Sequence, residues 1–324
     1  MRRLTPAIAA VVVVMALSGC GPSSEELGGV LEGSCLRSAN GEHADPVSKV
    51  DCEEPHLFEV TSMGGWPGLG VAMADAGGDA GDVWDAIHGL DDSDDSTVAA
   101  DFATWASRAC AEGAQRTTGI SEVKVDGHTA SDLWLRVGGT YGIDITTATR
   151  AAFIAGDQGT YCSLAWYDDS GAARLLAGRP FSQLLGPGFD LDRRECWDVD
   201  DRPTSCARPH AAQVLLAFDG LEAFGPELIA RAASGVPTDL DRAAGDSFCA
   251  ELLRQTLPSV AETDEVGFVS EPAAGSAWDE YDGTIDPRGG YFYACLAVGP
   301  QGGDLVIGDV MDGTARLQAT GGDG

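Results

Sequence analysis

Apolar and polar residues follow two periods along this chain, and the order of these periods predicts the fold class. Short runs rich in Val and aromatic residues predict strands at 47–52, 57–62, 132–137, 160–167, 212–218, 265–270 and 291–298. Apolar residues at three- and four-residue steps predict helices at 83–88, 97–116, 226–233 and 238–256. Strands, then a helical hairpin, then strands indicate an α+β fold with mostly antiparallel sheets.

One ten-residue pattern occurs twice in the chain. DCEEPHLFEV at 51–60 is matched by SCARPHAAQV at 205–214. The pattern contains Pro55, His56 and Glu59 in the first copy, and Pro209, His210 and Gln213 in the second. Cysteines flank both copies in the same order, which indicates an internal duplication. We therefore expect two tandem modules, 33–185 and 194–320, joined by a stretch at 185–189 that contains Gly and Pro.

The first twenty residues are typical of an export signal. Arg2 and Arg3 precede an apolar run at 7–17 that is too short to span a bilayer. Leu-Ser-Gly-Cys20 follows directly and resembles the lipobox of bacterial lipoproteins. The resemblance implies that residues 1–19 are a signal peptide, that Cys20 carries a diacylglyceryl group, and that 20–32 form a tether. The protein would then be lipid-anchored on the extracytoplasmic face of the cell membrane.

Eight further cysteines form two groups of four, one group in each module. An even number in an exported chain favours disulfide bonds, and a Cys-x-x-Cys pair typical of metal or redox chemistry is absent. Four cysteines allow three pairings per module. The expected elements favour pairing the first cysteine with the second, near strand ends, and the helical third with the fourth. The eight residues are Cys35, Cys52, Cys110, Cys162, Cys196, Cys206, Cys249 and Cys295.

The composition excludes one class of partner. The formal net charge is −31, so the protein surface repels phosphate backbones, and we expect no nucleic-acid binding. Lys49 and Lys124 are the only lysines, while Ala and Gly are abundant. This bias fits a GC-rich genome and indicates an actinobacterium. Beyond the first twenty residues, no apolar run approaches the length of a membrane span.

The first module resembles a known family. Its order is Gly-x-Cys-Leu, Val-x-Cys-x-x-Pro-His-x-x-Glu-Val, a helical Cys and a strand Cys, and it resembles the septum-formation domain of actinobacterial envelope proteins, most closely over Gly33 to Val60. The second copy departs where Arg194 replaces the Gly, Trp197 replaces the Leu, and Gln213 replaces the Glu. The resemblance implies an extracytoplasmic, disulfide-bonded module linked to cell division, and it implies no known reaction.

Histidine is the usual base and metal ligand at neutral pH, so His56 and His210 are the candidates for chemistry. The favoured interpretation is structural, because Pro fixes the backbone after each cysteine and the histidine can then satisfy a backbone group. The acidic stretch 91–96 lacks the Gly and the distal Glu of an EF-hand loop. The sequence contains no Gly-x-Ser-x-Gly, Walker or Rossmann motif.

These observations predict a non-enzymatic binding or scaffold lipoprotein of the cell envelope that needs no cofactor. Its expected partner is an envelope or cell-wall protein, in septum formation or cell-wall assembly. Two alternatives stay open. One is an envelope hydrolase or metal-dependent enzyme with His56 or His210 in its site. The other is a sensor or inhibitor domain for another exported protein.

Overall fold

The structure is a computed structural model. The chain forms two compact units. The N-terminal unit contains the described residues between 30 and 117 and between 141 and 181, and the C-terminal unit contains those between 118 and 139 and between 182 and 318. The described residues are 30–38, 47–88, 97–139, 141–167, 173–185, 194–200, 202–233, 239–261, 266–272, 292–299, 305–311 and 314–318. The predicted signal peptide, Cys20, the acidic stretch 91–96 and most of the predicted linker lie outside them.

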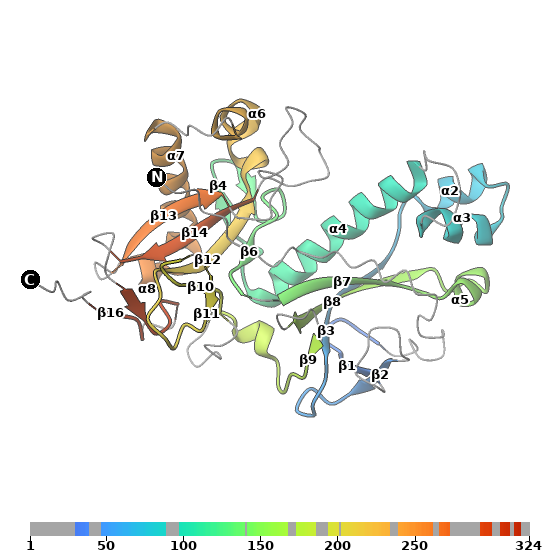
Figure 1. Cartoon of the computed structure of the whole chain (residues 1–324). Helices are drawn as coiled ribbons and strands as arrows, with labels where there is room; N and C mark the ends of the chain where they lie inside the picture. Colours follow the sequence, from blue (N-terminus) through green and yellow to red (C-terminus); the bar gives the residue numbers. More distant parts are fainter. Residues whose placement is uncertain are drawn as a thin grey trace, which may run out of the picture. The chain divides into compact units, whose positions relative to one another are not determined.

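The N-terminal unit is built on one antiparallel sheet with the strand order β2-β1-β3-β8-β7 (Figure 1). A short strand, β9, pairs with β8. The strands are β1 (Cys35–Ser38), β2 (Val47–Val50), β3 (Phe58–Gly65), β7 (Tyr141–Thr147), β8 (Gly159–Tyr167) and β9 (Ala173–Arg174). The helices are α2 (Leu69–Asp75), α3 (Ala80–Ile87), α4 (Thr97–Thr118) and α5 (Arg150–Ile154), and a 3-10 helix occupies Pro180–Gln183.

Helix α4 packs closely on strand β3. The Ser62 hydroxyl donates to the carbonyl of Ala109, and a Cβ on Gly113 would lie 2.8 Å from the Ser62 side chain. A larger residue at position 113 would therefore push the helix off the sheet. A cluster of buried aromatic side chains, including Trp66, Trp84 and Phe102, joins the helices α2, α3 and α4.

The C-terminal unit is built on a second antiparallel sheet with the order β11-β10-β12-β14-β13, and β6 also pairs with β12 (Figure 1). Its strands are β6 (Arg136–Val137), β10 (Cys196–Trp197), β11 (Pro203–Thr204), β12 (Ala212–Asp219), β13 (Gly267–Pro272) and β14 (Phe292–Val298). Two small hairpins add β4 (Lys124–Val125) with β5 (His128–Thr129), and β15 (Leu305–Ile307) with β16 (Arg316–Gln318). The helices are α6 (Gly220–Ala233), α7 (Asp239–Thr256) and α8 (Pro258–Ala261).

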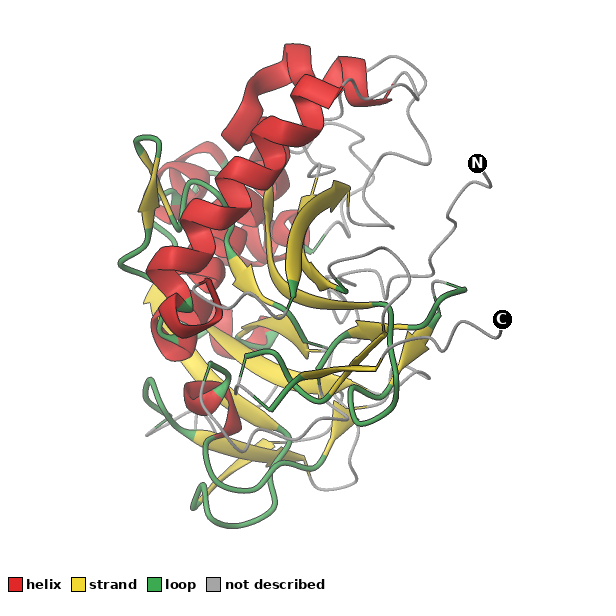
Figure 2. Cartoon of the chain, turned by 90° about the vertical axis from the view of Figure 1, so that its left-hand side faces the viewer, coloured by secondary structure: helices red, strands yellow, loops and turns green. Residues whose placement is uncertain are grey.

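Both units combine helices with antiparallel strands (Figure 2), which confirms the predicted α+β class. The five-strand paths of the two sheets correspond in order, and each central pair contains an irregularity at the same place, between Val60 and Ser62 in β3 and between Val214 and Leu216 in β12. These parallels support the duplication. The predicted module limits, 33–185 and 194–320, stay a prediction, because residues 118–139 group with the C-terminal unit.

One predicted strand forms only in part. Within the predicted run 132–137 only Arg136–Val137 is a strand, and it pairs with β12 of the C-terminal unit. Trp134 has a positive φ of 48°, which interrupts an extended backbone just before β6. The strand beside β8 at the edge of the N-terminal sheet is β7 (Tyr141–Thr147), which was not among the predicted strands.

Among the described residues, every helix is too short or too polar to cross a membrane.

Candidate functional site

Four disulfide bonds connect the eight cysteines, which confirms the prediction of disulfides and the favoured pairing. Cys35–Cys52 and Cys196–Cys206 close short loops near the start of each sheet, with sequence separations of 17 and 10. Cys110–Cys162 and Cys249–Cys295 tie a helix to a strand, with separations of 52 and 46. Loops of these lengths stabilise a fold by about 3 to 4 kcal/mol each in the chain-entropy model.

Each short loop leads into a Pro-His corner, defined here as the Cys-x-x-Pro-His turn together with the later segment that pairs with its histidine. In the N-terminal corner the backbone of His56 exchanges two hydrogen bonds with Leu176, at 3.0 and 2.7 Å. In the C-terminal corner His210 does the same with Val306, at 2.9 and 2.8 Å. The two copies of the motif therefore hold the same place in their sheets.

The two histidine side chains are fully enclosed, each with 0 % of its surface exposed. Nδ1 of His56 lies 2.8 Å from the carbonyl oxygen of Glu54, and Nδ1 of His210 lies 2.9 Å from that of Arg208. A carbonyl oxygen only accepts, so Nδ1 donates and carries the proton. Burial, the largest cause, lowers the pKa of both histidines, which favours the neutral ring.

This geometry supports the structural interpretation of both histidines. Nε2 of each ring is buried and has no hydrogen-bond partner within the described part of the chain, so it meets no carboxylate that could orient it as a base. The described residues also contain no group of three or more His, Cys, Asp or Glu side chains placed to hold a metal ion.

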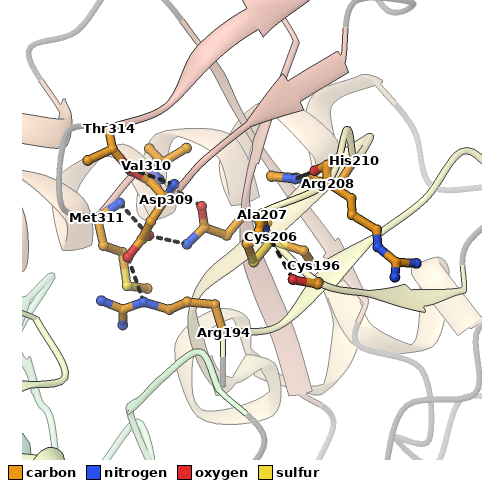
Figure 3. Close-up of a disulfide and its surroundings, with 12 residues drawn as sticks. Arg194, Cys196, Cys206, Ala207, Arg208, His210, Asp309, Val310, Met311 and Thr314 are labelled. Atoms are coloured by element: carbon orange, nitrogen blue, oxygen red, sulfur yellow. Dashed lines mark hydrogen bonds and ion pairs between the residues drawn. A yellow bond between two sulfur atoms is a disulfide. The ribbon is translucent and has the colours of Figure 1, made fainter. Parts of the chain in front are cut away.

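The C-terminal corner is filled by a buried polar network that the sequence did not predict (Figure 3). Arg194 Nε donates to Asp309 Oδ2 at 2.8 Å, and Gln213 Nε2 donates to Asp309 Oδ1 at 2.6 Å. The amides of Val310 and Met311 donate to Gln213 Oε1 and Asp309 Oδ1, at 2.8 and 2.9 Å. Breaking a buried ion pair of this kind costs about 3 to 5 kcal/mol.

Glu59 occupies the corresponding position in the N-terminal corner. It pairs with Cys35 across the strands, just as Gln213 pairs with Cys196. Its side chain is only 4 % exposed, Oε1 has no hydrogen-bond partner within the described structure, and the carboxylate accepts from the Phe181 amide. Burial raises the pKa of Glu59 to about 7, although the Phe181 hydrogen bond and the charge of Arg179 oppose this rise.

An open cleft lies beside the Cys35–Cys52 disulfide of the N-terminal corner. Its volume is about 410 Å³, and the disulfide forms part of its lining together with Gly33 and the exposed Arg179. The other charged lining residues are Glu32, Lys49, Asp51 and Glu53. Gly33 has a φ of +80°, and a Cβ there would lie 3.0 Å from Nη1 of Arg179, so the guanidinium lies directly against the glycine.

The two corners therefore differ in what they can do chemically. The C-terminal corner is filled by its own side chains, with both members of its ion pair buried. The N-terminal corner presents an exposed guanidinium at an open cleft, and such a group can bind an external carboxylate.

Comparison of the chain with protein-family models, curated proteins and solved structures found no match.

Proposed function

We propose that the protein is a non-enzymatic, lipid-anchored binding protein of the cell envelope. The observation that carries the proposal is the enclosure of His56 and His210 in equivalent corners, each ring hydrogen-bonded to a backbone carbonyl. An enclosed neutral imidazole cannot exchange protons with a substrate in solution. This arrangement speaks against the alternative of a hydrolase or metal-dependent enzyme centred on either histidine.

The disulfides support an extracytoplasmic location. Such bonds persist in oxidising compartments and are rare in a reducing cytosol. Four of them, at sequence separations between 10 and 52, fasten both units of this chain. The lipobox-like residues before Cys20 fit the same location, since lipid on that cysteine would hold the protein at the outer face of the membrane.

The class of partner follows from the resemblance to the septum-formation domain. We propose an envelope or cell-wall protein that acts in septum formation or cell-wall assembly. The net charge of −31 favours a neutral or basic partner surface over a nucleic acid or an anionic lipid headgroup. The disulfide-fastened sheets would act as a rigid support for that contact.

Fatty-acid labelling in cells tests the anchor. The wild-type protein should incorporate a labelled fatty acid and sediment with membranes, whereas Cys20→Ser should incorporate none. Ser18→Ala is the matched control, because it keeps a small residue before Gly19-Cys20 and should retain the label. Equal labelling of Cys20→Ser and wild type would refute the anchor.

Crosslinking in intact cells, followed by mass spectrometry of the captured proteins, tests the binding role. A reproducible envelope protein captured by wild type is the expected result. Hydrolytic or other turnover of envelope material by the purified protein, abolished by His56→Ala without loss of thermal stability, would instead support the enzyme.

A further inference from the structure

The two Pro-His corners use different residues at matching positions. Gly178 and Gly308 donate their amides to Cys52 and Cys206 at 2.7 and 3.0 Å, so the residues after them, Arg179 and Asp309, hold corresponding places. Gly33 and Arg194 correspond in the same comparison, because each lies two residues before the first cysteine of its copy. The arginine thus comes from the later segment in the N-terminal corner and from the segment before the first cysteine in the C-terminal corner.

This difference decides which corner is open. In the C-terminal corner Arg194 reaches inward, is 2 % exposed, and pairs with the buried Asp309. In the N-terminal corner Gly33 has no side chain to fill the same space. Arg179 comes from the other segment, lies over Gly33, and remains exposed at the cleft. One corner is closed from within, and the other leaves a space for a ligand.

We infer that this cleft binds a short zwitterionic peptide, whose carboxylate pairs with Arg179 and whose ammonium group faces the carboxylates of the rim. The inference rests on the proposed function, in which the protein binds its ligands without converting them. It adds a small ligand to the protein partner proposed above and assigns that ligand to the N-terminal corner.

The charges around the cleft favour a ligand that carries both signs. Two cations, Lys49 and Arg179, share the lining with three carboxylates. A purely anionic ligand would meet these carboxylates and the strongly negative protein, which disfavours it electrostatically. A purely apolar ligand would desolvate charged groups without compensating them. A zwitterion can pair with both kinds of group at once.

The dimensions favour a small ligand. A volume of about 410 Å³ lies near the lower end of the range for small-molecule sites, about 300 to 1,000 Å³. Leu31, which is 64 % exposed, lines the cleft with Val50 and the disulfide, and these groups can contact a short aliphatic side chain. A dipeptide with small side chains meets these requirements, so alanyl-alanine is the appropriate probe.

Titration calorimetry tests the inference on the full-length protein purified in detergent. Alanyl-alanine should bind wild type, and its C-terminal amide should bind at least about tenfold more weakly, because a hydrogen bond to a charged group contributes about 1.5 to 3 kcal/mol. Arg179→Ala should weaken the dipeptide by a similar factor. Arg179→Lys should recover part of it, since lysine keeps the charge but loses the planar pair of donors.

Arg174→Ala is the matched control, because it removes another exposed arginine of the same unit that does not line the cleft. It should bind the dipeptide like wild type. Failure of wild type to bind alanyl-alanine, or equal binding by Arg179→Ala and wild type, would overturn the inference. The proposed function would survive that failure if fatty-acid labelling and capture of an envelope protein persist, so the two are separable.

Discussion

The N-terminal corner predicts a distinct pH dependence that a single isosteric substitution removes. Glu59 lies on β3, which runs between β1 and β8. It pairs with Cys35 and Leu164 on these strands and is 4 % exposed. Burial raises its pKa from the ordinary 4.5 to about 7. Between these two pH values the folded protein holds a proton that the unfolded chain releases. Stability therefore falls as the pH rises through this window.

The size of this effect follows from the two pKa values. A pKa raised from 4.5 to about 7 corresponds to a loss of about 3 kcal/mol in the free energy of unfolding above pH 7. Glu59→Gln has the shape of the protonated side chain and carries no charge at any pH. Its stability relative to wild type should therefore increase by up to about 3 kcal/mol between pH 4.5 and pH 8.

Scanning calorimetry at a series of pH values measures this difference. In a unit of this size, about 3 kcal/mol corresponds to about 6 to 12 °C in melting temperature. The amide of the new Gln side chain can itself lack a partner, at a cost of about 1 to 3 kcal/mol. That cost does not depend on pH, so it shifts the whole curve without changing its slope.

The C-terminal corner supplies the reciprocal substitution as a control. Gln213→Glu replaces an amide that donates to Asp309 at 2.6 Å with a second carboxylate. Two adjacent carboxylates repel when both are ionised, so this variant should lose stability as the pH rises. Parallel melting curves for wild type and Glu59→Gln from pH 4.5 to 8 would refute the raised pKa of Glu59.

Three further predictions concern the buried groups of both corners. His56→Ala and His210→Ala should each lower the free energy of unfolding by about 1 to 3 kcal/mol in thermal melts, since each removes a partly buried hydrogen bond to a backbone carbonyl; an unchanged melting temperature would contradict this. Burial lowers the pKa of both histidines from 6.5, so below this pH the unfolded chain binds protons that the folded chain excludes. Acid should therefore destabilise the wild type more than the double variant His56→Asn with His210→Asn. Arg194→Met should cost about 3 to 5 kcal/mol in urea unfolding, because Asp309 then stays buried without its cation; stability equal to wild type would show that the ion pair contributes little.

The repeated cysteine pattern explains why much of the fold could be predicted from the sequence. The repeated order of cysteines indicated which cysteine accompanies a helix and which accompanies a strand, and the long amphipathic runs indicated α4 (Thr97–Thr118) and α7 (Asp239–Thr256). These features depend on local periodicity and on the short range of disulfide geometry. The pairings Cys110–Cys162 and Cys249–Cys295 follow from the same reasoning.

Features that depend on tertiary context could not be predicted in the same way. Strand β7 (Tyr141–Thr147) has apolar residues at every second position from Tyr141 to Ile145, but Gly142 and Asp144, which are uncommon in strands, stand between them. A Cβ on Gly142 would lie 2.7 Å from the Tyr167 ring, and Tyr167 donates to Asp144 at 2.6 Å. The two residues that are uncommon in strands are thus the ones that fit the neighbouring strand. Only the folded sheet shows this.

The candidate site was predicted in part. The repeated pattern identified His56, Glu59, His210 and Gln213, and the structure places each at its corner. The charged partners Arg179 and Asp309 were missed, because each follows its motif by about a hundred residues or more and lies outside any recognisable pattern. The sequence contained one signal for Asp309, because the second copy has Arg194 where the first copy has Gly33. A new buried arginine requires a carboxylate nearby.

The backbone and the charge of the N-terminal corner both oppose an arginine at position 33. An arginine at position 33 would have to begin with a Cβ 3.0 Å from Nη1 of Arg179, at a backbone φ of +80° that side chains rarely adopt. Two guanidinium groups in one corner would also repel each other. Converting the N-terminal corner into the C-terminal arrangement therefore needs changes at both positions and in the backbone. The open cleft is thus separated from the closed corner by several linked changes, so loss of one side chain at position 33 does not by itself account for the cleft.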